Sequence, residues 1–111
     1  MDKLAKYREY VQAVMMQYVA DEKDDGDVKV ELIMDSMRDH YQWMDVGWQG
    51  LKRVYNCYIH IDIIDGKIWL QQNWTEKDPA AELVEMGVPH EDIVLGLHAP
   101  YKRPYTDYGV A

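Results

Sequence analysis

The sequence predicts an α+β fold, with an N-terminal helix packed on a four-stranded, largely antiparallel sheet, followed by a short helix and an extended C-terminal tail. Apolar residues recur every three to four positions up to residue 19 and every second position from residue 28, which indicates a helix and then a strand. An Asp-Gly pair at 65–66 joins two further apolar runs as a hairpin. A chain of 111 residues builds one core, so we expect a single domain over residues 1–111.

The first expected element is a helix over residues 4–19. Its apolar residues share one stripe because they recur at steps of three and four: Leu4, Tyr7, Val11, Val14, Met15, Tyr18 and Val19. Asp2 is placed to cap the helix, and the acidic run at 21–27 ends it as a solvated loop. A calcium loop is disfavoured, because residues 28–30 already have strand character where an EF-hand still needs ligands.

Four strands are expected after the helix. The first covers residues 28–35 and has one apolar face, and the second covers about 40–48, with Gln49-Gly50 as the turn. The third and fourth, over residues 54–64 and 67–74, are joined by the Asp-Gly turn. Consecutive strands joined by such short turns form an antiparallel sheet.

The Asp-Gly turn also predicts which residues of the third and fourth strands face one another. With two turn residues, we expect uninterrupted pairs from Ile64 with Lys67 to Cys57 with Trp74. One face is then apolar and should lie against the helix: Cys57, Ile59, Ile61, Ile63, Ile68 and Leu70. The other face is mixed and aromatic: Tyr58, His60, Asp62, Trp69, Gln71 and Asn73. Cys57 is therefore expected to be an unreactive core residue.

The C-terminal third is expected to hold one short helix and an irregular tail. Thr75 or Asp78 can cap a helix over residues 79–85, which a glycine then ends. Residues 89–93 indicate one further helical turn. The proline-rich segment 99–105 suits neither a helix nor a central strand, so it should run extended over the surface.

Charge and cysteine content limit the classes of function. Twelve basic and twenty acidic residues give a net charge of −8, which repels phosphate backbones. Direct DNA binding through Lys52, Arg53, Lys102 and Arg103 is therefore a minor alternative. The single cysteine fits a reducing compartment, and no apolar run is long enough to span a membrane. We expect a cytoplasmic protein with no membrane association.

A series of short motifs runs through nearly the whole chain in one order. They are Arg38-Asp39-His40-Tyr41-Gln42, Val46-Gly47-Trp48, Lys52-Arg53-Val54, His60-Ile61-Asp62-Ile63, Asp65-Gly66-Lys67-Ile68-Trp69, Glu82-Leu83-Val84, Gly87-Val88-Pro89, Glu91-Asp92-Ile93-Val94-Leu95-Gly96 and Pro100-Tyr101-Lys102-Arg103. No single motif is specific, but in this combination and order the chain resembles the XisI family.

The resemblance implies a controlling role in excision of the fdxN element, where a site-specific recombinase removes DNA that interrupts a nitrogen-fixation gene. It implies an XisH-like protein as partner, an indirect association with DNA and the recombinase, and neither recombinase nor nuclease activity of the chain itself. We expect that the chain is not an enzyme. The rival interpretation is a binding module that neutralises or chaperones a partner nuclease, since an acidic chain suits a basic groove. Self-association into a homo-oligomer is left open.

A metal-dependent enzyme is the third alternative. His60 and Asp62 project from the same strand face, and such a pair supplies two ligands of the triad that holds ferrous iron. A third ligand could come from His40, His90 or His98, but the sequence gives no distance between them. We therefore expect no metal and no other cofactor.

Nuclease chemistry is also disfavoured. Asp65-x-Lys67, with Asp35 or Asp45 upstream, superficially fits a magnesium-dependent nuclease. The hairpin turn uses Asp65 to reverse the chain, however, and should leave its side chain in solvent. No arrangement of nucleophile and base or phosphate-binding glycine loop is recognisable.

Two surfaces remain as candidates for binding a partner: the mixed sheet face and the C-terminal tail. The candidate residues are Tyr58, His60, Asp62, Trp69, Gln71, Asn73, His98, Tyr101, Lys102 and Arg103. Aromatic side chains with polar tips, and arginine, are enriched at contact hot spots. The alternative is that the tail of the chain itself covers the sheet face.

Overall fold

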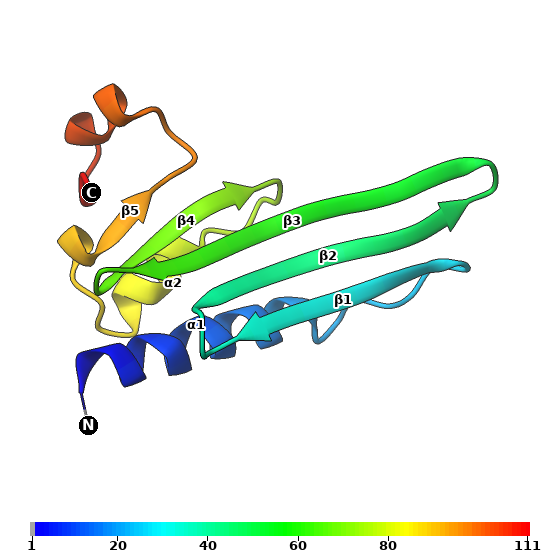
Figure 1. Ribbon diagram of the computed structural model, residues 1–111, viewed down its shortest axis with the longest axis horizontal. Helices are drawn as coiled ribbons and strands as arrows, with labels where there is room; N and C mark the ends of the chain where they lie inside the picture. The colour runs from blue at the N-terminus through cyan, green and yellow to red at the C-terminus, as the bar shows by residue number, and fades with distance from the viewer. Residues whose placement is uncertain (1) are drawn as a thin grey trace.

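The computed structural model describes residues 2–111 and places both α-helices on one face of a five-stranded sheet (Figure 1). The elements are α1 (Lys3–Val19), β1 (Val28–Asp35), β2 (His40–Gln49), β3 (Lys52–Ile64), β4 (Lys67–Asn73), α2 (Pro79–Glu85), η1 (His90–Asp92), β5 (Ile93–Leu95) and η2 (Pro100–Tyr105). The α+β class is confirmed. No helix among the described residues is long and apolar enough to cross a bilayer.

The helix α1 follows its predicted stripe. The Asp2 carboxylate accepts a hydrogen bond from the Ala5 amide at 2.8 Å, so the predicted N-cap is confirmed. The residues of α1 that are buried against the sheet are Tyr7, Val11, Val14, Met15 and Tyr18. Burying each such side chain stabilises the fold by about 1.5–3 kcal/mol, so packing holds this helix in place.

The sheet has five strands, so the expectation of four was wrong. Their order is β1-β2-β3-β4-β5, and the added strand β5 runs parallel to β4, with Ile93 beside Ile68. A parallel pair needs a crossover, which α2 provides. Ile93 was expected in a helical turn, but only residues 90–92 form one. Three residues are too few to show the alternation by which a strand is recognised.

The Asp65-Gly66 turn is confirmed, but the predicted pairing holds for only part of the hairpin. Both turn residues have positive φ, 51° and 78°, as a type I′ turn requires. The expected pairs hold as far as Ile61 with Leu70. A β-bulge at Gln71 then shifts the register by one residue, so that His60 pairs with Gln72.

A second bulge, at Tyr58, changes which residues of β3 face the helices. Trp43 of β2 pairs with Ile59, but its neighbour Met44 pairs with Cys57, so Tyr58 has no partner on β2. Tyr58 turns to the helix side, where its ring centroid lies 5.4 Å from that of Trp43. The placements of Cys57 on the helix face and Tyr58 on the opposite face were therefore wrong, because the extra residue reverses the alternation.

The long β2–β3 hairpin extends beyond the helix that covers its other end (Figure 1). The 17 residues of α1 span about 25 Å, whereas the 13 residues of β3 span about 43 Å. The longest dimension of the molecule, 44 Å, matches the strand length. One end of the hairpin is therefore left without a helix beneath it.

The C-terminal segment folds back over the β5 edge of the sheet instead of running extended. Pro100–Tyr105 forms the 3-10 helix η2, because Pro100 fits the first turn of a helix, where no amide donor is needed. Beyond it, the Gly109 amide donates to the Ile93 carbonyl at 2.7 Å. The expectation of an extended tail was therefore wrong.

Candidate functional site

The face of the sheet that points away from α1, here called the open face, carries a cluster of polar side chains at the β2–β3 pair. His40 begins β2 and lies directly opposite Asp62 of β3, while His60 lies two residues before Asp62 on the same face. The carboxylate oxygen Oδ1 of Asp62 is 2.8 Å from His40 Nδ1 and 2.8 Å from His60 Nε2. The other oxygen, Oδ2, accepts a hydrogen bond from Gln71 Nε2 at 3.2 Å. Both histidines therefore converge on one oxygen atom.

The cluster lies between the protein interior and solvent. The side chain of Asp62 is 11 % exposed, that of His60 30 % and that of His40 57 %. Burial alone would raise the pKa of Asp62, but the hydrogen bonds from His40 and His60 outweigh burial and hold this pKa below its ordinary value. The hydrogen bond with Asp62 raises the pKa of His40 in turn, against its partial desolvation.

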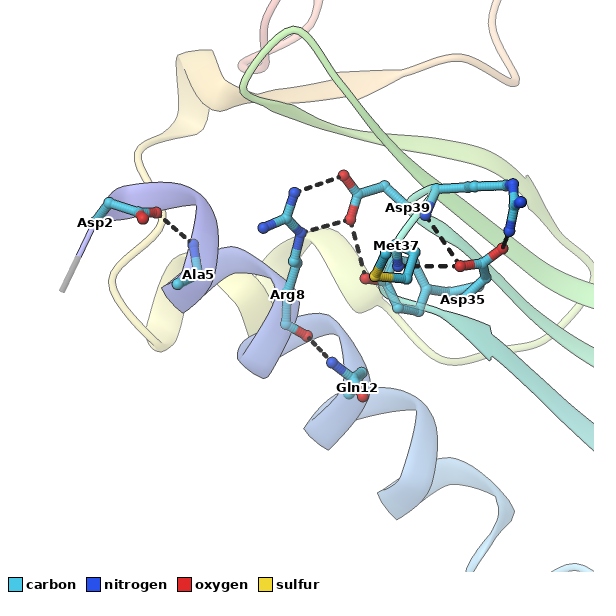
Figure 2. Close-up of polar contacts among 9 residues, drawn as sticks. Asp2, Ala5, Arg8, Gln12, Asp35, Met37 and Asp39 are labelled. Atoms are coloured by element: carbon cyan, nitrogen blue, oxygen red, sulfur yellow. Dashed lines mark hydrogen bonds and ion pairs between the residues drawn. The ribbon is translucent and has the colours of Figure 1, made fainter.

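The turn that carries His40 is tied to α1 by an ion pair, which Figure 2 shows. Asp39, which is buried and has a φ of 63°, receives hydrogen bonds from Arg8 of α1 at 2.8 and 3.1 Å. Asp35 accepts hydrogen bonds at 3.0 Å from the amides of Met37 and Arg38, which shapes the rest of the turn. These contacts hold the first residue of β2 in place beside β3.

The cluster has the composition of a metal-binding triad. The ligand atoms of His40, His60 and Asp62 all lie within 4.8 Å of one another. The sequence had singled out His60 and Asp62 as two ligands and had left the third open. The pairing of β2 with β3 brings His40 to them; among the described residues, no such group includes His90 or His98.

The tail covers part of the predicted sheet-face surface. The guanidinium carbon of Arg103 lies 5.1 Å from the ring centroid of Trp69, and its Nε donates to the His98 carbonyl at 3.1 Å. The side chains of Trp69 and Arg103 therefore contact each other within the chain. Tyr101 and Lys102 remain exposed.

Two predicted members of the sheet-face surface lie elsewhere. The hydroxyl of Tyr58 donates to Asp45 at 3.1 Å on the helix side. Asn73 pairs with Ile59 after the bulge, and its amide donates to the Lys77 carbonyl at 2.8 Å. The structure does not bring these two side chains together with His60: Tyr58 is itself the bulged residue of β3, and the bulge at Gln71 reverses the alternation of β4 before Asn73.

The end of the β2–β3 hairpin carries a surface that the sequence reasoning missed. We call it the hairpin tip and define it as Trp48, Leu51, Lys52, Arg53 and Tyr55. Trp48 is 50 % exposed, Tyr55 66 % and Leu51 fully exposed. The guanidinium carbon of Arg53 lies 5.5 Å from the Trp48 ring centroid and 5.8 Å from that of Tyr55. The difference in length between the predicted helix and the predicted strands would have indicated that this end is uncovered.

Comparison with known proteins shows what the chain as a whole is similar to. The family model described as XisI protein matches residues 1–110. A XisI-like protein from Anabaena variabilis of known crystal structure is 66 % identical, with a TM-score of 0.93, 97 % of this chain and 99 % of that chain covered. The fdxN element excision controlling factor XisI of Anabaena variabilis is 37 % identical, with a TM-score of 0.90, 99 % of this chain and 100 % of that chain covered. No curated protein matches the chain.

Proposed function

The chain belongs to the XisI family, and from this membership we propose that it is a non-enzymatic controlling factor for excision of a DNA element, acting through contacts with an XisH-like protein. The observation that supports excision control most directly is the likeness to the Anabaena variabilis excision controlling factor, which extends over 99 % of the chain. The match also covers 100 % of that protein's chain, and the family model matches residues 1–110. The proposal therefore concerns the entire chain.

The hairpin tip is the surface that we propose for the partner. Its exposed Trp48 and Tyr55 both lie beside the guanidinium group of Arg53, so the three side chains form one contiguous surface. Trp, Tyr and Arg are the residues that contribute most at contact hot spots. The tip also projects beyond the end of α1 (Figure 1).

Charge supports a protein partner more than DNA. Lys52 and Arg53 are basic, but the chain as a whole carries a net charge of −8, which opposes a phosphate backbone. The same charge suits the rival function, in which the chain occupies the basic groove of a partner nuclease and neutralises it. His60, Asp62, Tyr101 and Lys102 remain secondary candidates for the contact.

The test measures binding of a purified XisH-like protein by calorimetry, using the wild type and a variant that carries both Trp48→Ala and Tyr55→Ala. We expect this variant to bind with at least a tenfold higher Kd, as removal of hot-spot side chains typically gives. The matched control is Trp74→Ala, because Trp74 is 66 % exposed but lies in the β4–α2 loop. Equal binding by all three proteins would refute the tip as the contact surface.

A cleavage assay separates the proposed function from its rival. The XisH-like protein is incubated with duplex DNA, with and without this chain, and nicked or cut products are counted. Suppression of cleavage by the wild type, and not by the tip variant, would favour the neutralising binding module. Equal cleavage with and without the chain, together with retained complex formation, supports a controlling factor that acts at the recombinase. Sizing the chain alone shows whether it self-associates.

A further inference from the structure

We propose that His40, His60 and Asp62 form a binding site for a divalent transition-metal ion of the zinc class. Ions of this class bind imidazole nitrogens as well as carboxylate oxygens, and the site offers two of the former and one of the latter. Calcium and magnesium prefer oxygen ligands alone. Three protein ligands leave a fourth position of a tetrahedral ion to water. The more exposed side of the cluster, at His40, is where that water would enter.

The separations between the ligand atoms are close to those that a metal ion needs. A tetrahedral ion with bonds of about 2.0–2.2 Å holds its ligand atoms about 3.3–3.6 Å apart. Asp62 Oδ1 lies 2.8 Å from each histidine nitrogen, and all three ligand atoms lie within 4.8 Å of one another. Opening the two short contacts by about 0.5–0.8 Å, while the two imidazole nitrogens turn toward each other, makes room for the ion. The exposed His40 ring can make that movement without disturbing the core.

The direction of the histidine rings suits metal binding. Both imidazoles turn a ring nitrogen toward Oδ1 of Asp62, so three donor atoms of the kinds that zinc binds lie within 4.8 Å of one another. Gln71 bonds the other oxygen, Oδ2, and thereby orients the carboxylate, as groups behind a metal ligand commonly do.

The ligands of the triad lie on two paired inner strands of the sheet. His40, the first residue of β2, is directly opposite Asp62 of β3, and His60 comes from the same strand as Asp62. The ion pair between Arg8 and Asp39 holds the turn that precedes His40. Ligands on paired strands keep their spacing better than ligands on loops, so little order must be gained when the ion binds.

The test is calorimetric titration of the metal-free protein with Zn²⁺, with Co²⁺ absorption as a second readout of coordination geometry. The wild type is expected to bind one ion, and His40→Ala and His60→Ala are expected to weaken binding at least tenfold. Gln71→Ala should weaken it about 10–100-fold, as loss of a group that orients a ligand typically does. The matched control His98→Ala, whose imidazole is not part of the triad, should bind as the wild type does.

The variants also give the outcomes that would overturn the site. His40→Ala replaces a largely exposed side chain, so its folding, checked by circular dichroism, should be intact. If the wild type binds no Zn²⁺, or if His40→Ala and His60→Ala bind it as tightly as the His98→Ala control, the site does not exist. Binding of the XisH-like protein is measured separately on the same variants. Failure of the metal site would leave the partner proposal unaffected.

Discussion

Arg8 of α1 and Asp39 of the β1–β2 turn form a two-point ion pair, with Nε 2.8 Å from Oδ1 and Nη2 3.1 Å from Oδ2. Asp39 also accepts a hydrogen bond from the Tyr41 hydroxyl at 3.2 Å, and its own amide and carbonyl are bonded to Asp35 and Ile63. Asp39 therefore links the helix to β2 through its carboxylate and to β1 and β3 through its backbone. It also fixes the turn from which His40 enters the sheet.

Replacing Arg8 with Ala should lower the free energy of unfolding by about 1–3 kcal/mol, because a buried carboxylate loses its charged partner. The measurement is chemical denaturation. Arg38→Ala is the matched control: Arg38 is largely exposed and pairs with Asp35 at 3.4 Å, so its loss should cost no more than about 0.5 kcal/mol. Equal effects of the two substitutions would contradict a structural role for the Arg8 pair.

Asp92 should make stability depend on acid pH. Burial alone would raise its pKa, but hydrogen bonds from Tyr7 and Lys3 outweigh burial and hold the pKa below the ordinary 3.8. Its contribution is therefore complete above pH 3.8 and is lost as the pH falls through the lower folded-state pKa. The stability difference between wild type and Asp92→Asn, measured by urea unfolding, should shrink over that range. In a Tyr7→Phe background, the effect of Asp92→Asn on the free energy of unfolding should be smaller at every pH above that range.

Gly47 is required by a close approach of two backbone segments. A Cβ at this position would lie 2.0 Å from the Asp27 carbonyl oxygen and 2.8 Å from the Val28 Cα. Gly47→Ala must push the loop away from β2 and should lower stability by about 1–3 kcal/mol. The control is Gly50→Asn, since Gly50 has open space around it and Asn tolerates its φ of 63°. Comparable melting temperatures for the two variants would contradict the steric account.

Arg103 should hold the C-terminal segment on the sheet through its contact with the Trp69 ring. Arg103→Ala should cost about 1–2 kcal/mol locally, which corresponds to about 5–30-fold faster amide exchange at Leu97 and Gly109. These amides donate to Leu70 and Ile93 in the sheet, at 3.1 and 2.7 Å. Lys102→Ala is the control, because Lys102 is exposed. Unchanged exchange in the Arg103 variant would show that other contacts hold the tail.

The sequence predicted those features of the fold that depend on local patterns. The helix stripe, the cap at Asp2 and the turn at Asp65-Gly66 are set by residues close together in the chain, and all three are confirmed. The two bulges were not predicted, because a bulge leaves no local signal: β3 alternates regularly in sequence while Tyr58 sits unpaired in space. The strand β5 depends on its neighbour β4 for its existence.

The polar cluster was predicted only in part, because local sequence brings together two of its three residues and not the third. His60 and Asp62 share a face because they are two residues apart on one strand, which the sequence shows directly. His40 joins them through the register of β2 with β3. That register depends on the bulge at Tyr58, which lies opposite Trp43 and Met44. The exposed hairpin tip follows from comparing helix and strand lengths, a comparison that local patterns do not make.

The unmatched Tyr58 gives β3 an unusual tolerance. Deleting one residue from a strand normally carries every side chain beyond it to the wrong side of the sheet. Here the removal of Tyr58 would join Cys57 directly to Ile59, and both would keep their present partners, Met44 and Trp43. A chain shortened by this one residue should therefore keep its pairing with β2, while losing the Tyr58 ring, the local bend and the hydrogen bonds of Tyr58 with Asp45 and with the Trp74 amide. Evolution could lengthen or shorten the hairpin at this point without exchanging its two surfaces.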